Sequence, residues 1–209
     1  ILNFKNLLKI KNIIIKKTNN IIAFNYKSNE KNYLHNKQKF FLTYSNYKLK
    51  NKLTNFFYLK LHYPIIFFLF KKKFLLRNKI KFKKGYYEDI LFLLKVLLKN
   101  NNKKIYFIKE IIYIKNFTKK SITSRFSIKH MEDYIKVWIL CSKLLKYNLK
   151  DKILVKKLIQ VAFRGVLGYL IFNLKKKNIT HFENNIIFRK FLKLVIPKFK
   201  AKLKYDRIA

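Results

Sequence analysis

Acidic residues, cysteine, glycine and proline are all scarce in this chain, and each shortage excludes a class of protein. Nine Asp and Glu stand against 50 Lys and Arg, so the formal net charge is +41. A chain with this charge repels itself and binds any polyanion that it meets, which argues against a self-sufficient cytosolic enzyme. A single cysteine, Cys141, rules out a disulfide-stapled secreted scaffold. Three glycines and two prolines rule out a collagen-like or linker protein.

Long apolar runs are also missing, although half of the chain is hydrophobic and 17% is aromatic. That aromatic content excludes a disordered polycation. A helix that spans a bilayer needs roughly 18–20 apolar residues in a row. The best run, Leu61–Phe70, is closed by Lys71, and the run Val161–Leu174 is interrupted by Arg164. Both are typical of buried core segments, so the sequence predicts no transmembrane segment.

The composition that remains is biased toward residues whose codons are rich in A and T. Lys, Asn, Ile, Leu, Phe and Tyr supply 159 of the 209 positions, and Lys outnumbers Arg by 45 to 5. Because Arg is the better fork for phosphate, chemistry alone does not select this ratio. The bias indicates an AT-rich genome, either organellar or from an AT-rich protist. Runs of Lys and Asn are therefore partly a product of mutation, and a lone Lys is interpreted as a surface position without a selected role.

The distribution of charge divides the chain into three parts. Residues 31–87 contain no carboxylate, whereas eight of the nine acids lie at or beyond residue 88. An ordinary solvated surface mixes both signs. We therefore expect a mainly α protein in which residues 1–85 are a long basic, partly extended arm embedded in RNA. Residues 86–197 are expected to form a small helical domain, and residues 198–209 a basic tail.

Apolar spacing predicts five helices in the helical domain, and alternation over Arg77–Lys84 indicates an extended strand or arm before it. The first helix begins near Glu88 and Asp89 and ends at Asn100–Asn102. The others are expected at Lys103–Ile114 (with Ile105, Ile108 and Ile112 on one stripe), His130–Tyr147, Asp151–Lys177 and Phe182–Val195. In the third, a buried seam is expected from Tyr134, Trp138, Cys141 and Leu145. The acids near these starts are interpreted as helix-start residues and not as catalytic pairs: Glu88, Asp89, Glu132, Asp133, Asp151 and Glu183.

Residue types that carry catalytic or metal-binding chemistry do not cluster. Four widely spaced histidines and one cysteine give no metal-ligand spacing. Cys141 is interpreted as a small buried hydrophobe. Gly165 and Gly168 lack the spacing of a nucleotide-binding loop and are interpreted as a site of close helix contact. The sequence thus predicts no catalytic residue, no metal, no cofactor and no small-molecule substrate, and an enzyme is not expected.

The basic clusters are the candidate site that remains. Residues 71–84 place eight cations in 14 positions, and a similar series ends the chain. Lysines that neutralise phosphates release counterions and bind nucleic acid with a steep salt dependence. Phe and Tyr beside such runs can stack on unpaired bases. The predicted RNA-binding residues are Lys71, Lys72, Lys73, Arg77, Lys79, Lys81, Lys83, Lys84, Lys103, Lys104, Lys119, Lys120, Arg125, Lys198, Lys200, Lys202, Lys204 and Arg207.

In composition and in its division into a basic arm and a helical domain, the whole chain resembles organelle-encoded ribosomal proteins of AT-rich protists such as ciliates. One segment combines an apolar helix from Asp89, a polar turn with Lys103 and Lys104, and a second apolar stretch to Ile112. It is similar to the helix, Gly-Lys-Lys turn and helix of the small-subunit ribosomal protein seven family, with Asn102 in place of the glycine. The resemblance implies that Lys103, Lys104 and the N-terminal arm contact RNA of the small-subunit head.

We therefore expect a structural constituent of the mitochondrial ribosome in the mitochondrial matrix, with the small subunit favoured. Its partners in this translation ribonucleoprotein would be ribosomal RNA and neighbouring ribosomal proteins. Two alternatives stay open. One is a peripheral subunit of a mitochondrial inner-membrane complex, whose basic and aromatic segments would lie on anionic lipid. The other is an organellar RNA-processing factor.

Overall fold

The computed structural model describes residues 4–16, 19–28, 49–58, 65–101, 103–115 and 127–177, together with residues 186, 188, 189, 191 and 192. Helices make up 70% of the described residues, which confirms the prediction of a mainly α protein. Packing divides the chain into two units. Unit 1 comprises residues 1–83 and 92–125, and unit 2 comprises residues 84–91 and 126–209. This division differs from the expected domains because residues 92–125 belong with the N-terminal part.

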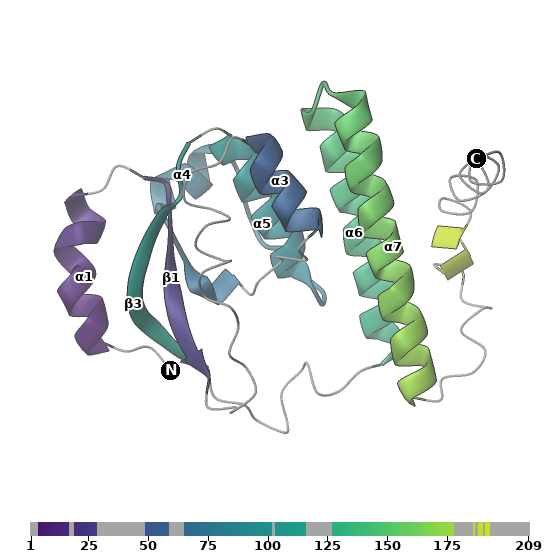
Figure 1. The fold of residues 1–209 in the computed structure, drawn as a ribbon, viewed down its shortest axis with the longest axis horizontal. Coiled ribbons are helices and arrows are strands. Elements are labelled where there is room, and N and C mark those ends of the chain that lie inside the picture. The colour runs from purple at the N-terminus through teal and green to yellow at the C-terminus, as the bar shows by residue number, and fades with distance from the viewer. Residues whose placement is uncertain are drawn as a thin grey trace, which may run out of the picture. The chain divides into compact units, whose positions relative to one another are not determined.

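A three-stranded mixed sheet organises unit 1 (Figure 1). The central strand β1, Ile21–Ser28, is antiparallel to β2, Phe68–Phe70, and parallel to β3, Tyr106–Lys115. Helix α1, Phe4–Lys16, packs on this sheet. Its Ile10 joins a buried cluster with residues of β1 and β3, namely Ile22, Phe24, Ile108 and Ile112. The Asn6 side-chain amide of α1 also donates to the carbonyl of Ile111 at 2.8 Å.

Strand β3 corrects the prediction of a helix at Lys103–Ile114. Ile108 and Ile112 are buried, at 3% and 0% exposure, as the apolar stripe required. A spacing of four residues places two side chains on the same face of a helix and also on the same face of a strand. The segment is rich in β-branched and aromatic residues, which favour a strand over a helix; its sequence is YFIKEIIYIK. The residues that carry the resemblance to ribosomal protein seven therefore form a helix and a strand.

Helix α5, Glu88–Asn100, confirms the first predicted helix. Its residues Ile90–Leu94, Val96 and Leu97 are each at most 3% exposed, as expected of a helix that is apolar on nearly all sides. Asn101 follows with φ 47°, a left-handed conformation that Asn tolerates better than most residues and that ends helices. The Asn run thus stops α5 where the sequence predicts.

Short elements complete unit 1: helix α3 at Leu49–Tyr58, a 3-10 turn η1 at Ile65–Phe67, and helix α4 at Lys72–Arg77. After α4, the Lys79 N–H donates to the Leu76 carbonyl and the Ile80 N–H to the Leu75 carbonyl, both at 3.0 Å. With Lys79 at φ 51°, these two bonds form a Schellman motif. Residues 78–87 are neither helix nor strand, so the alternation over Arg77–Lys84 does not produce a strand.

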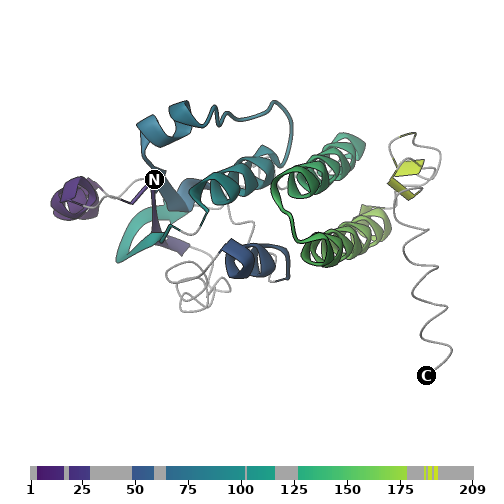
Figure 2. The same cartoon turned by 90° about the horizontal axis from the view of Figure 1, so that it is seen from above.

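Two long helices form the body of unit 2 and lie side by side (Figures 1 and 2). They are α6, Ile128–Asn148, and α7, Lys152–Lys177, and they confirm the third and fourth predicted helices. The seam of α6 is buried as expected: Tyr134, Trp138, Cys141 and Leu145 are at most 6% exposed. Asp151 precedes α7, and its Oδ1 accepts the Leu154 N–H at 2.8 Å. That bond is the N-cap interaction expected of an acid at a helix start.

Two features of unit 2 differ from the sequence predictions, and a third prediction lies mostly outside the described residues. Helix α6 begins at Ile128, so Glu132 and Asp133 lie in its second turn and not at its start. A Cβ added to Gly168 would meet nothing within 4 Å, so this glycine is not a site of close helix contact. Of the fifth predicted helix, Phe191 is buried against Phe163, with ring centroids 5.4 Å apart, while Glu183 and most of the remainder lie outside the described residues.

Candidate nucleic-acid interface

The structure describes ten of the 18 predicted RNA-binding residues, and all ten are exposed. They are Lys71, Lys72, Lys73, Arg77, Lys79, Lys81, Lys83, Lys84, Lys103 and Lys104. The other eight lie outside the described residues: Lys119, Lys120, Arg125, Lys198, Lys200, Lys202, Lys204 and Arg207. Because all ten positively charged side chains reach solvent, they are available to an external polyanion.

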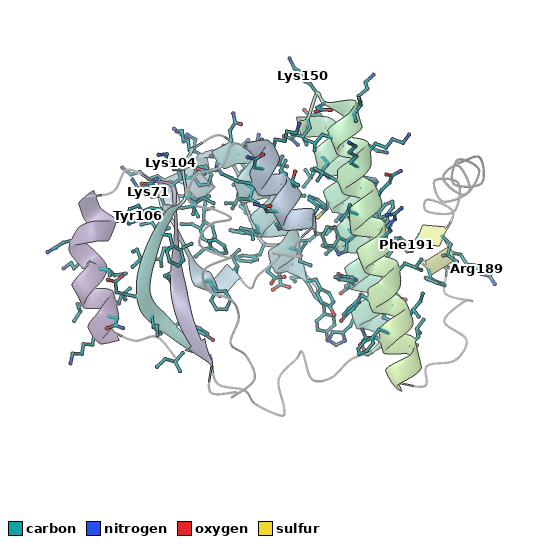
Figure 3. All side chains as sticks on the ribbon, viewed as in Figure 1. Lys71, Lys104, Tyr106, Lys150, Arg189 and Phe191 are labelled. Carbon is teal, nitrogen blue, oxygen red and sulfur yellow. The ribbon has the colours of Figure 1, made fainter. Side chains whose placement is uncertain are left out.

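Unit 1 brings two of the lysine runs together, although 30 residues separate them in sequence. We call the set Lys71–Lys73 and Lys103–Lys104 the basic corner. Lys71 follows the last residue of β2, and Lys104 lies just before β3. Both lysines therefore sit at the end of the sheet where the central strand β1 begins. Figure 3 shows Lys71 and Lys104 beside each other at this end of the sheet, with Tyr106 below them.

Two asparagines before β1 hold the basic corner in place. The Asn20 carbonyl accepts the Lys71 N–H at 3.0 Å, and the Asn19 side-chain amide donates to the Lys104 carbonyl at 2.9 Å. The Asn20 amide also donates to Oδ1 of Asn100 at 3.2 Å, and the Asn100 amide donates to the Lys103 carbonyl at 2.9 Å. These bonds fix the backbone of both lysine runs and leave the lysine side chains free to point outward.

Lys52 of α3 supports the same corner from inside. Its side chain is fully buried, and its Nζ donates to the Asn101 carbonyl at 3.1 Å and to the Lys103 carbonyl at 2.6 Å. Those carbonyls follow the C-terminal end of α5, where the helix dipole favours a cation. Burial lowers the pKa of Lys52 to about 8, because removal from water disfavours the charged form.

The lysines of the basic corner are not compensated within the described part of the chain. The ion pairs recorded there join Lys129 and Lys136 to Glu132 and Asp133, all on α6. Helix α4 has no acid in its first turn, where Lys72 and Lys73 lie against the positive end of the helix dipole. In the protein without a bound partner, these lysines therefore gain no stabilising interaction with a negative charge.

The two units also differ in net charge. Unit 1 holds 29 Lys and Arg against two acids, Glu30 and Glu110, which gives +27. Unit 2 holds 21 Lys and Arg against seven acids, which gives +14. Unit 1 therefore provides the stronger electrostatic attraction for a polyanion, and it also contains the basic corner.

A tyrosine cluster in unit 2 is another grouping of titratable side chains among the described residues. The Tyr87 and Tyr169 hydroxyls are hydrogen-bonded at 2.6 Å, and the Tyr134 ring lies 4.6 Å from that of Tyr169. Burial raises the pKa of Tyr134 to about 12 and raises that of Tyr87 further, so both hydroxyls stay protonated at neutral pH. The cluster packs between elements and offers no activated nucleophile, so we assign it to the core.

Within the described ranges, no group of three or more His, Cys, Asp or Glu is placed to hold a metal ion. The helices that these ranges contain are all too short or too polar to cross a bilayer.

Sequence reasoning found the exposed lysines but missed the residues that organise them. The sequence does not single out Lys52, Asn20 or Asn100, because Lys and Asn are abundant throughout a chain with this compositional bias. A usable signal existed for Lys52, since it shares the spacing of Leu53, Phe56 and Phe57, which are all buried on α3. Asn100 carried no such signal beyond its place at the end of an apolar helix.

Comparison with known proteins does not assign the chain to a family. No protein family, no curated protein and no solved structure matches it.

Proposed function

We propose that the chain is an RNA-binding structural constituent of the mitochondrial ribosome, with unit 1 as its main contact to ribosomal RNA. The observation that carries the proposal is the basic corner, in which two lysine runs are fixed side by side by their backbones and reach solvent without a carboxylate partner among the described residues. RNA supplies the negative charge that the fold lacks.

A structural role fits better than a catalytic one. The corner presents fixed, exposed ammonium groups, which bind phosphate as point charges and position a protein on RNA without reading its sequence. The compositional bias toward A and T codons favours an organellar gene, and the ribosome is the RNA-rich assembly that we propose as its site. We propose the small subunit as the first fraction to examine.

Salt-dependent RNA binding tests the corner directly. Each phosphate neutralised contributes about 0.7–0.9 to the slope of log K against log salt. The double variant Lys72→Ala/Lys104→Ala should therefore lower the slope by about 1.5 and weaken binding at low salt. The measurement is fluorescence anisotropy of labelled ribosomal RNA from about 50 to 300 mM salt.

A matched control uses two exposed lysines that already face carboxylates. Lys129 lies 3.0 Å from Asp133, and Lys136 lies 3.7 Å from Glu132. The double variant Lys129→Ala/Lys136→Ala should leave the slope close to that of the wild type. Equal slopes for both double variants, or no RNA affinity of the wild-type protein at low salt, would contradict the proposal.

Fractionation separates the ribosome from the other two assignments. The protein should sediment with mitochondrial ribosomes and be released by high salt. Release by detergent alone would instead indicate an inner-membrane complex. Crosslinking followed by sequencing of the bound RNA should recover ribosomal RNA, whereas recovery of intron or guide RNA would indicate a processing factor.

A further inference from the structure

Phe82 is an exposed aromatic ring that rests on a buried one. Its ring is stacked on that of Phe92, with centroids 4.2 Å apart and planes at 14°. Phe92 is 3% exposed and is itself held edge-on by Phe70 at 5.5 Å. Phe82 nevertheless remains 54% exposed, the fraction expected of a ring with one face covered and the other open.

The backbone before Phe82 is fixed, so the open ring face has a defined position within unit 1. Lys79 and Ile80 close the Schellman motif at the end of α4, and Ile80 is buried at 6% exposure. Phe82 follows two residues later and packs on α5 through Phe92. An aromatic ring that is ordered before binding loses little conformational entropy when a second ring stacks on it.

Cations flank Phe82 in the sequence, and its segment contains no carboxylate. Arg77, Lys79, Lys81 and Lys83 are all exposed, and residues 31–87 contain no Asp or Glu. A preordered aromatic face between ammonium groups matches a single-stranded nucleic acid, in which each phosphate is accompanied by a flat base. A protein partner would need acidic side chains beside an apolar one, whereas RNA provides both features in every nucleotide.

We propose that Phe82 is a stacking platform for an unpaired base of bound RNA, with Lys81 and Lys83 on the adjoining phosphates. The inference rests on the proposed function and specifies it. Within the RNA, this part of unit 1 takes a single-stranded nucleotide, because bases inside a duplex already stack on their neighbours and do not present a free face.

The test compares affinities of the full chain for a 12-nucleotide single-stranded RNA and for a duplex of the same length. Phe82→Leu keeps an apolar contact with Phe92 but removes the aromatic face. It should lower affinity for the single strand about tenfold, within the range reported for loss of one stacked base, and leave affinity for the duplex unchanged. The salt slope should also stay unchanged, because no phosphate contact is lost.

Two further variants make the outcome decisive. Phe82→Trp keeps a stacking face, so it should retain affinity, and its added fluorescence should be quenched when the single strand binds. Leu76→Ala removes another exposed apolar side chain, 62% exposed on α4, and should leave single-strand affinity unchanged. If Phe82→Leu alters the circular dichroism spectrum, the quenching of Phe82→Trp alone decides.

The possible failures are distinguishable. Wild-type binding of the single strand that Phe82→Leu leaves intact, or a Phe82→Trp signal that RNA does not quench, overturns the platform while the proposed function stands. Loss of co-sedimentation with ribosomes without loss of RNA affinity would also overturn it and assign Phe82 to a protein partner. An absence of any RNA affinity in the wild type overturns the proposed function itself.

Discussion

Lys52 places an ammonium group inside unit 1, where its hydrogen bonds go to two backbone carbonyls. Its pKa falls to about 8 in the folded protein, against about 10.4 for an unperturbed lysine. Between these two values the unfolded chain binds more protons than the folded chain. The free energy of unfolding must therefore rise with pH across this window, and the cost of burying the charge is fully present below pH 8.

Lys52→Met should remove this pH dependence. The wild-type free energy of unfolding, minus that of the variant, should increase between pH 8 and about 10, because only the wild type loses a proton more readily when folded. The measurement is denaturant unfolding at several pH values. Lys50→Met is the matched control, since Lys50 lies on the same helix but is exposed. A wild-type and Lys52→Met difference that is flat with pH would contradict the assignment.

At the scale of single residues, the sequence predicts which lysines are exposed and which apolar side chains are buried, but it does not predict which polar side chains are buried. All ten described lysines and arginines chosen from the basic runs reach solvent. The buried Lys52 and Asn100 could not be identified, because their roles depend on carbonyls that α5 and β3 bring together from elsewhere in the chain. A hydrogen-bond partner that is distant in sequence leaves no local pattern.

At the scale of elements, helix α7 contains a weak point. Gly168 lies in its interior and is exposed, and a Cβ there would meet no atom within 4 Å. Glycine in a helix interior costs about 0.5–1 kcal/mol relative to alanine, because it loses more backbone freedom on folding.

Gly168→Ala should therefore raise the free energy of unfolding by about 0.5–1 kcal/mol, as measured by thermal or denaturant unfolding. Gly85→Ala provides a control with the opposite sign. Gly85 has φ 127°, and a Cβ there would lie 3.0 Å from Oδ2 of Asp133, so this variant should lose about 1–3 kcal/mol. Destabilisation by Gly168→Ala would show that the glycine is required after all.

The elements that could be predicted are the long helices. Helices α5, α6 and α7 combine long apolar stretches with start or stop residues such as Asp151 and Asn101. Strand β3 was mistaken for a helix because its buried isoleucines are four apart, a spacing shared by both structures. Strand β1 went unpredicted because its Ile-Ile-Ala-Phe run is short and its pairing partners are remote.

At the scale of the whole molecule, the net charge of +41 sets how stability responds to ions. Mutual repulsion opposes the compact state, and salt screens it with a Debye length of about 30 Å at 0.01 M and about 10 Å at 0.1 M. On α6, Lys129 and Lys136 form ion pairs with Glu132 and Asp133, whereas the lysines of the basic corner have no carboxylate partner among the described residues.

Raising sodium chloride from about 10 to 300 mM should therefore increase stability, and it should do so more in unit 1 than in unit 2. Hydrogen exchange with mass spectrometry reports the two units separately. Amides of β1 and β3 should gain more protection than those of α6 and α7, because unit 1 carries +27 and unit 2 carries +14. Equal gains, or a loss of protection with salt, would mean that repulsion does not govern stability.

The parallel pairing of β1 with β3 sets an order of events during synthesis. Ile22 pairs with Tyr106, 84 positions later in the chain. At roughly 5–20 residues per second, between about 4 and 17 s pass before the partner strand exists. Contacts of such long range also slow folding. The Asn19 bond to Lys104 cannot form earlier, so the nascent chain displays Lys71–Lys73 as a loose polycation first and acquires the fixed corner only after β3 is made.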